Sequence, residues 1–81
     1  MLLSEDGTSI YSIEGSNFFI YDSNSGGLKG SWFGEPGTTA KTMDVMGTRV
    51  AIGFQQGKIF LLDISNVSNI VAAVIQTNSK L

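Results

Sequence analysis

This chain of 81 residues contains neither cysteine nor histidine. Without cysteine there is no disulfide and no thiolate metal ligand, and the redox compartment does not follow from the sequence. Without histidine the chain lacks the commonest metal ligand and the side chain that titrates nearest neutral pH. A nucleophile and its base would have to come from serine, threonine, lysine or carboxylates, and no serine lies in a Gly-x-Ser-x-Gly setting. We therefore expect no enzyme activity, no metal site and no cofactor.

Clustered charge and long apolar runs are also scarce. Five basic and seven acidic residues leave a net charge of −2, and the basic residues are scattered, so no stripe that would follow a phosphate backbone is present. The longest aliphatic run, residues 70–75, is too short to span a bilayer, and residues 1–6 lack the pattern of a secretory signal. These observations predict a soluble protein, most consistent with the cytoplasm, that binds neither nucleic acid nor membranes.

What the sequence does contain is an internal repeat. Gly-Thr-Ser-Ile at residues 7–10 returns as Gly-Thr-Arg-Val at 47–50, and the apolar run that ends at Asp22 returns as one that ends at Asp63. The two anchors are 40 and 41 residues apart. A period of this length is typical of propeller blades and solenoid units.

Short apolar runs separated by glycine, asparagine, aspartate and serine indicate strands and tight turns. The third run of each repeat is apolar on both faces, which predicts that neighbouring sheets cover it on both sides. We predict an all-β fold of two four-stranded antiparallel, propeller-like blades. The expected strands are residues 1–4, 9–13, 17–21 and 28–32 in one repeat and 41–45, 49–54, 58–64 and 70–76 in the other. The corresponding units are a first blade (1–32), an inter-blade loop (33–40), a second blade (41–77) and a C-terminal tail (78–81).

The repeat also has a family resemblance. Residues 56–63, Gln-Gly-Lys-Ile-Phe-Leu-Leu-Asp, resemble the third strand of WD-repeat propellers, and Tyr21-Asp22 and Leu62-Asp63 take the places of the Trp-Asp pair. Residues 4–7 look like the Ser-Pro-Asp-Gly turn of such blades, and residues 61–69 are similar to the propeller-like repeats named for Leu-Val-Ile-Val-Asp. Neither repeat has the Gly-His pair of the WD family. The resemblance therefore implies propeller blades in general and leaves the specific family open.

Two blades do not close a ring, because closure takes at least about four. The chain is then a segment of a longer propeller, a protomer that completes a ring with its own copies, or a self-contained small barrel or sandwich. The last predicted strand is uncharged and close to the end of the chain, which is typical of an edge that must be paired or covered.

Asp22 and Asp63 end equivalent strands, so we expect both to cap turns through side-chain to backbone hydrogen bonds. Residues 22–26 also resemble the start of a calcium loop, but Phe33 stands where such a loop has its bidentate glutamate. Residues 66–68 match the N-glycosylation sequon and fall in a predicted turn, which leaves glycosylation of Asn66 open.

The candidate binding residues are Trp32, Phe33 and Glu35, in or beside the linking loop, together with Gln55 and Lys58 in the turn between the second and third strands of the second blade. Aromatic side chains with a nearby charge are typical of protein-binding hot spots. Trp32 equally fits a position packed between blades. The sequence predicts a non-catalytic scaffold that binds protein partners. The alternative is an oligomeric carbohydrate-binding module with sugars between blades, and a propeller hydrolase would need residues outside this chain.

Overall fold

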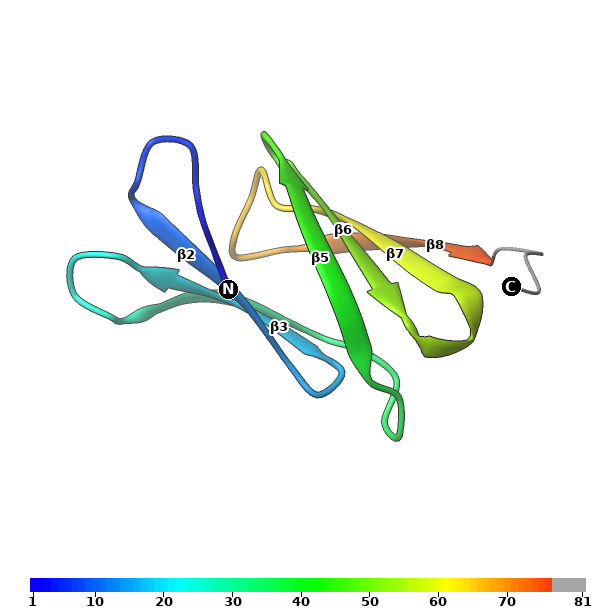
Figure 1. Cartoon of the computed structure of the whole chain (residues 1–81). Helices are drawn as coiled ribbons and strands as arrows, with labels where there is room; N and C mark the ends of the chain where they lie inside the picture. Colours follow the sequence, from blue (N-terminus) through cyan, green and yellow to red (C-terminus); the bar gives the residue numbers. More distant parts are fainter. Residues whose placement is uncertain (77–81) are drawn as a thin grey trace.

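The computed structural model describes residues 1–76 of the chain. Its strands form two four-stranded antiparallel sheets, and within each sheet every strand pairs with the next one along the chain. The strands are β1 (Leu2–Leu3), β2 (Ser9–Glu14), β3 (Asn17–Asp22) and β4 (Leu28–Phe33) in the first sheet, and β5 (Ala40–Met46), β6 (Arg49–Phe54), β7 (Lys58–Asp63) and β8 (Val71–Gln76) in the second (Figure 1). The predicted all-β class is confirmed, and the described residues contain no α-helix, only a single 3₁₀ turn at Gln55–Gly57.

The strand bounds follow the predicted ones closely. The largest differences are one residue at each end: β1 covers Leu2–Leu3 where residues 1–4 were expected, and β5 covers Ala40–Met46 where residues 41–45 were expected. The segment that joins the sheets is residues 34–39, one residue shorter at each end than the expected inter-blade loop. Residue 77 and the expected tail, residues 78–81, lie outside the described residues. Between residues 1 and 76, no helix has the length and apolar character needed to cross a membrane.

Glycine sets two of the tight turns. Gly15 lies between β2 and β3 with φ of 64°, and Gly47 lies between β5 and β6 with φ of 60°. This left-handed backbone region carries little steric cost for a residue without a Cβ, and short hairpin turns require it. The glycines therefore fix where each hairpin reverses, and with it the register of the strands.

The register shows that the two sheets correspond residue by residue. Ser9 pairs with Asp22 in the first sheet as Arg49 pairs with Asp63 in the second. Two residues further along the same strands, Tyr11 pairs with Ile20. In the same way Ala51 pairs with Leu61. Each position on β2 and β3 therefore has an equivalent on β6 and β7.

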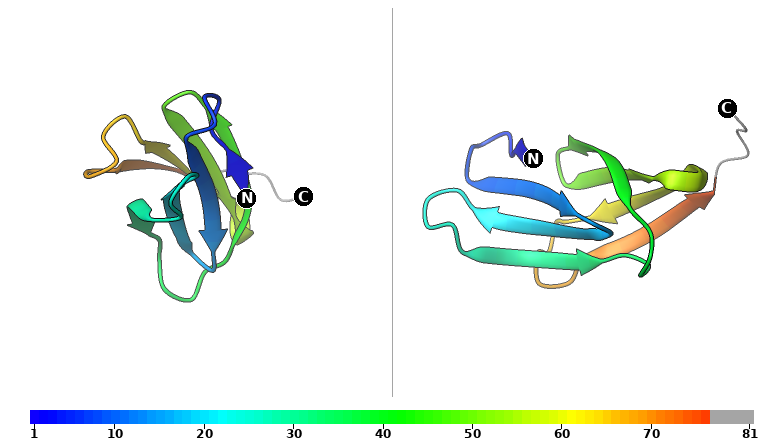
Figure 2. Two further views of the ribbon diagram at one scale, coloured as in Figure 1. Left: turned by 90° about the vertical axis from the view of Figure 1, so that its left-hand side faces the viewer. Right: turned by 60° about the horizontal axis from the view of Figure 1, so that its bottom comes forward.

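The core lies between the sheets, where one face of each is buried. The first sheet contributes Tyr11, Phe18 and Ile20 from neighbouring strands. The second sheet contributes an aliphatic surface of Val50, Ile52 and Leu62. Figure 2 shows the two sheets from two further directions. Partly buried apolar residues surround this core: Ile13, Trp32, Ala40, Met43, Val45, Phe60, Val67 and Ile70.

The two sheets meet through faces that are not equivalent. We call the face with Tyr11, Phe18 and Ile20 the front of the first sheet. The equivalent front of the second sheet holds Ala51, Ile59 and Leu61, which alternate with the buried residues and therefore point away from the core. The back of the second sheet holds Val50, Phe60 and Leu62, and the equivalent back of the first sheet holds Ile10, Phe19 and Tyr21. The contact thus joins the front of one sheet to the back of the next.

This arrangement differs from the expectation that the third strand of each repeat is covered on both sides. On β3, Phe18 and Ile20 are buried, whereas Phe19 and Tyr21 on the back face are only half-buried. The reason is that two stacked sheets have one shared contact. In the described residues no third sheet covers the back of the first or the front of the second.

Candidate functional site

Three segments meet at one end of the molecule, which we call the loop end: residues 14–17, 34–39 and 55–58. The Gly34 amide donates to the Ser16 carbonyl at 3.0 Å, and the Ala40 amide donates to the Gly15 carbonyl at 2.8 Å. On the other side, the Gln55 amide donates to the Thr39 carbonyl at 3.3 Å. The joining segment is therefore fastened to both sheets, so the loop end presents a fixed surface.

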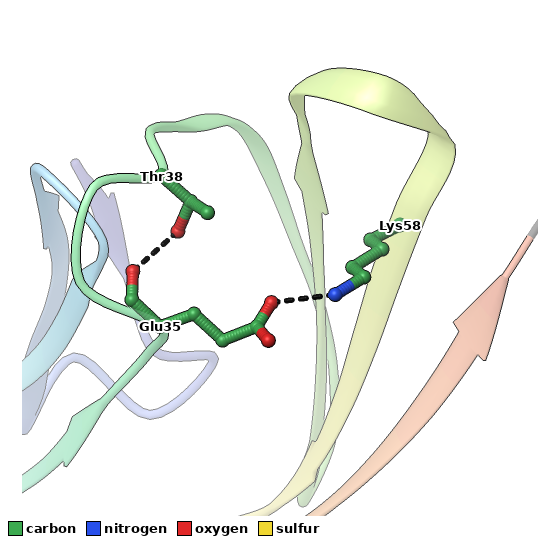
Figure 3. Close-up of polar contacts among 3 residues, drawn as sticks. All are labelled: Glu35, Thr38 and Lys58. Carbon is green, nitrogen blue, oxygen red and sulfur yellow. Dashed lines mark hydrogen bonds and ion pairs between the residues drawn. The ribbon is translucent and has the colours of Figure 1, made fainter.

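An ion pair spans this surface. Lys58 Nζ donates to Glu35 Oε1 at 2.7 Å, and the two side chains are 33% and 52% exposed (Figure 3). The backbone beside Glu35 is held by its own turn, because the Thr38 hydroxyl and amide both donate to the Glu35 carbonyl, at 2.6 and 3.2 Å. The carboxylate of the joining segment is thus positioned over the start of β7.

The two aromatic residues at the end of β4 point to opposite faces of the first sheet. Trp32 is half-buried in the core, with its ring centroid 4.9 Å from that of Phe60 and 6.4 Å from that of Phe54. Phe33 is 65% exposed and lies edge-on to Phe19, with centroids 6.1 Å apart. Strand alternation thus separates Trp32 from Phe33. Of the candidate binding residues, Phe33, Glu35 and Gln55 are exposed, Lys58 is half-buried and Trp32 is packed between the sheets.

The two aspartates that end β3 and β7 are turned toward their own backbones. Asp22 Oδ1 accepts hydrogen bonds from the amides of Asn24 at 2.8 Å and Ser25 at 3.1 Å. Asp63 Oδ1 accepts from the Ser65 amide at 3.0 Å. These bonds stabilise the charged carboxylates and lower the pKa of both groups. Among residues 1–76 no three aspartates or glutamates gather as metal ligands would.

A feature that the sequence analysis missed is a hollow between the sheets at the opposite end, which we call the inter-sheet hollow. Its volume is about 520 Å³, and the turns β1–β2 and β5–β6 and the β7–β8 connection border it. Tyr11, Ile20 and Ile64 are buried side chains in its lining. The hollow lies where the first turns of the two repeats, β1–β2 and β5–β6, meet across the contact between the sheets. The sequence marks these turns but gives no direct sign that they enclose a space.

The rim of the hollow is polar. Asp6 Oδ1 accepts hydrogen bonds from the Thr8 amide at 3.0 Å, the Ser4 hydroxyl at 2.7 Å and the Thr8 hydroxyl at 2.8 Å. These bonds, the Thr8 amide foremost, lower the pKa of Asp6 from 3.8 to about 2. Lys29 Nζ donates to the buried Ser9 hydroxyl at 2.7 Å. The carboxylates of Glu5 and Asp6 and the ammonium of Lys29 therefore border the opening.

Tyr11 brings a hydroxyl into this hollow. Its side chain is only 6% exposed, and the hydroxyl makes no hydrogen bond within the described part of the chain. No fully buried side-chain oxygen in that part lacks a partner, so the hydroxyl is not completely buried. Burial, and then the negative charge of Asp6, raise the pKa of Tyr11. The hollow thus contains a neutral phenol that can donate to a ligand.

Comparison of the chain with models of known protein families, with curated proteins and with solved structures found no match.

Proposed function

We propose that the chain is a non-catalytic segment of a β-propeller and that it acts as a scaffold, binding a protein partner at its loop end. The observation that carries this proposal is the joining segment itself. It is hydrogen-bonded to both sheets and carries Glu35, which pairs with Lys58 of the second sheet. The exposed ring of Phe33 ends β4 where this segment begins. A surface that is already ordered loses little conformational entropy when it binds.

The propeller interpretation is supported by the way the sheets pack. Each sheet is a four-stranded meander, and the front of the first lies on the back of the second. Repeated front-to-back contact is what arranges blades around an axis and leaves only short edges exposed. In this interpretation the two sheets are successive blades and residues 34–39 are the loop between them.

The chemistry of the loop end suits a protein surface. Phe33 supplies an aromatic side chain that an apolar pocket would bury, and the half-exposed ion pair beside the joining segment provides a polar rim. Aromatic anchors surrounded by polar contacts dominate binding energy at protein interfaces. We therefore expect the partner to present an apolar pocket with hydrogen-bonding groups at its edge.

Affinity capture with the full chain tests this proposal. Phe33→Ser removes the anchor, and Leu28→Ser is the matched control, because Leu28 is a similarly exposed apolar residue at the other end of β4. We expect at least one protein that binds the unchanged chain and the Leu28→Ser variant and is lost with Phe33→Ser. An identical set of bound proteins for all three chains would contradict the loop-end site.

A second candidate, carbohydrate binding between the sheets, is favoured by the inter-sheet hollow. Its volume of about 520 Å³ lies in the range of small-ligand sites, and the Tyr11 hydroxyl, Lys29 and Asp6 offer donors and an acceptor. Trp32 is packed in the core and is not a platform for a sugar ring. Binding of glycans that disappears with Tyr11→Phe would support this candidate, and a glycan array without any signal would eliminate it.

A further inference from the structure

The front-to-back contact leaves one unused face on each sheet. The back of the first sheet is uncovered, and its equivalent on the second sheet is the face that packs in the core. The front of the second sheet is also uncovered, whereas the front of the first sheet packs in the core. The two free faces are therefore the two halves of the contact that already joins the sheets.

From this we infer that the partner for both free faces is a second copy of the chain. The back of its first sheet, around Phe19 and Tyr21, packs on the front of the second sheet, around Ile59 and Leu61, and so repeats the internal contact between copies. This inference rests on the interpretation of the sheets as blades, but it does not depend on the loop-end partner.

Both free faces have apolar side chains at their centre, bordered by charged ones: Glu14 on the back of the first sheet, and Asp44, Arg49 and Asp63 on the front of the second. The back of the first sheet carries Phe19 and Tyr21 half-buried and Leu3 at 62% exposed. The front of the second sheet carries Ile59 and Leu61 half-buried, with Ile75 beside them on β8 at 45% exposed. Apolar side chains gathered on a sheet face are typical of a surface that another protein covers.

The sizes of the side chains are complementary. In the internal contact, the large front residues Tyr11 and Phe18 meet the aliphatic back residues Val50 and Ile52. On the free faces the sizes are exchanged, because Ala51 and Gly53 lie on the front, whereas Phe19 and Tyr21 lie on the back. Large side chains thus face smaller ones at the centre of both contacts, whereas Trp32 meets Phe54 and Phe60 at the loop end of the internal contact.

A small depression of about 190 Å³ marks where the second copy docks. It is lined by Leu61, Val71 and Ala73 on the front of the second sheet, among other residues. The position equivalent to Ala73 on the first sheet is Gly30, and there the β7–β8 connection already fills the site: a Cβ added to Gly30 would lie 2.5 Å from the Val67 carbonyl oxygen. The β3–β4 turn of a second copy is placed to fill the depression in the same way.

A front-to-back contact is heterologous, so its repetition closes a ring or continues as an open stack. Each copy contributes two sheets. Because known rings of this kind have about four to eight sheets, the expected closed assembly contains about two to four copies. A dimer in which two identical sheet faces meet would not use this geometry.

The test uses two variants of the full chain that each block one face with the same charge. Phe19→Lys blocks the back of the first sheet, and Leu61→Lys blocks the front of the second. The unchanged chain is expected to form a closed oligomer by native mass spectrometry, and each variant alone is expected to be a monomer. An equimolar mixture retains one intact contact, so it should form a one-to-one heterodimer with twice the mass of a single chain.

Thr48→Lys is the matched control, because it adds the same charge on an exposed turn away from both faces, and it should assemble like the unchanged chain. Circular dichroism checks the fold of each variant. Tyr21→Lys replaces Phe19→Lys if that variant unfolds, and Ile59→Lys replaces Leu61→Lys. A monomeric unchanged chain, or a mixture that stays monomeric, would overturn the inference. The assembly assay contains no other protein. Because Phe33 lies edge-on to Phe19 on the face that the second copy covers, partner capture is compared in the monomeric Leu61→Lys variant, in which that face is free. A Leu61→Lys monomer that captures no partner counts against the loop-end proposal alone, and a monomeric unchanged chain counts against this inference alone.

Discussion

Trp32 and Phe60 belong to different sheets, and their ring centroids are 4.9 Å apart. Phe54 completes a three-ring cluster, with centroids 6.4 Å from Trp32 and 5.2 Å from Phe60. The cluster lies at the loop end of the contact between the sheets, next to the joining segment. Two of its three contacts, those of Trp32, cross from one sheet to the other, so this ring joins the sheets.

We expect Trp32→Ala to lower the free energy of unfolding by about 3 kcal/mol, because it leaves a cavity between the sheets. Phe33→Ala is the matched control: it removes the neighbouring ring, which is 65% exposed, and should cost less than about 1 kcal/mol. Urea unfolding followed by circular dichroism measures both. Equal losses for the two variants would show that Trp32 does not join the sheets.

Gly34→Ala should be destabilising by about 2 kcal/mol or more, because the added Cβ would lie 2.3 Å from the Ser16 carbonyl oxygen. The variant should also weaken the bond from the Gly34 amide to that carbonyl, which amide hydrogen exchange detects. Gly27→Ala is the control, since its Cβ would meet only the Ser25 hydroxyl, at 3.3 Å. Unchanged exchange at Gly34 would contradict the close approach of the joining segment to the β2–β3 turn.

The Glu35–Lys58 ion pair should contribute little to stability, since its side chains are 52% and 33% exposed. A double-mutant cycle with Glu35→Gln and Lys58→Met is expected to give a coupling energy below about 1 kcal/mol. In about 1 M salt, where the screening length falls to about 3 Å, the coupling should vanish. A larger coupling that resists salt would indicate that this pair fixes the joining segment.

Acid should destabilise the fold through the turn aspartates. The pKa of Asp6 is about 2 in the folded chain and 3.8 as its ordinary value, so the stabilisation from its charge is complete above 3.8 and is lost as the pH falls toward 2. Asp22 and Asp63, whose pKa values are also lowered, add to the loss. Asp6→Asn keeps an acceptor oxygen but does not titrate. Between about pH 5 and pH 2, the free energy of unfolding should therefore fall less steeply in this variant than in the unchanged chain. Identical slopes would contradict the role of Asp6.

The hairpin architecture could be predicted from the sequence because its determinants are local. Turn glycines such as Gly15 and Gly47 stand between short apolar runs, and that pattern places strands without knowledge of the tertiary fold. The repeat then set the correspondence between the sheets. The register of Asp22 with Ser9 and of Asp63 with Arg49 carries that correspondence into the structure.

The surroundings of particular side chains were less predictable, because they depend on which faces meet. Trp32 and Phe33 are adjacent in sequence, and only the packing of the sheets decides that Trp32 turns to the core and Phe33 to solvent. The inter-sheet hollow has the same origin. Tyr11 on β2 and Ile64 beyond β7 line it from opposite sheets, 53 positions apart, and no local pattern connects them.

The buried contact between the sheets consists of hydrocarbon and aromatic side chains, from Tyr11, Phe18 and Ile20 to Val50, Ile52 and Leu62. Burial of such surface has a near-zero enthalpy at room temperature and a large heat-capacity change. Cooling therefore weakens this contact, while the backbone hydrogen bonds within each sheet do not share that dependence. The cold protein is expected to loosen first at the junction of its two halves, with each meander still intact.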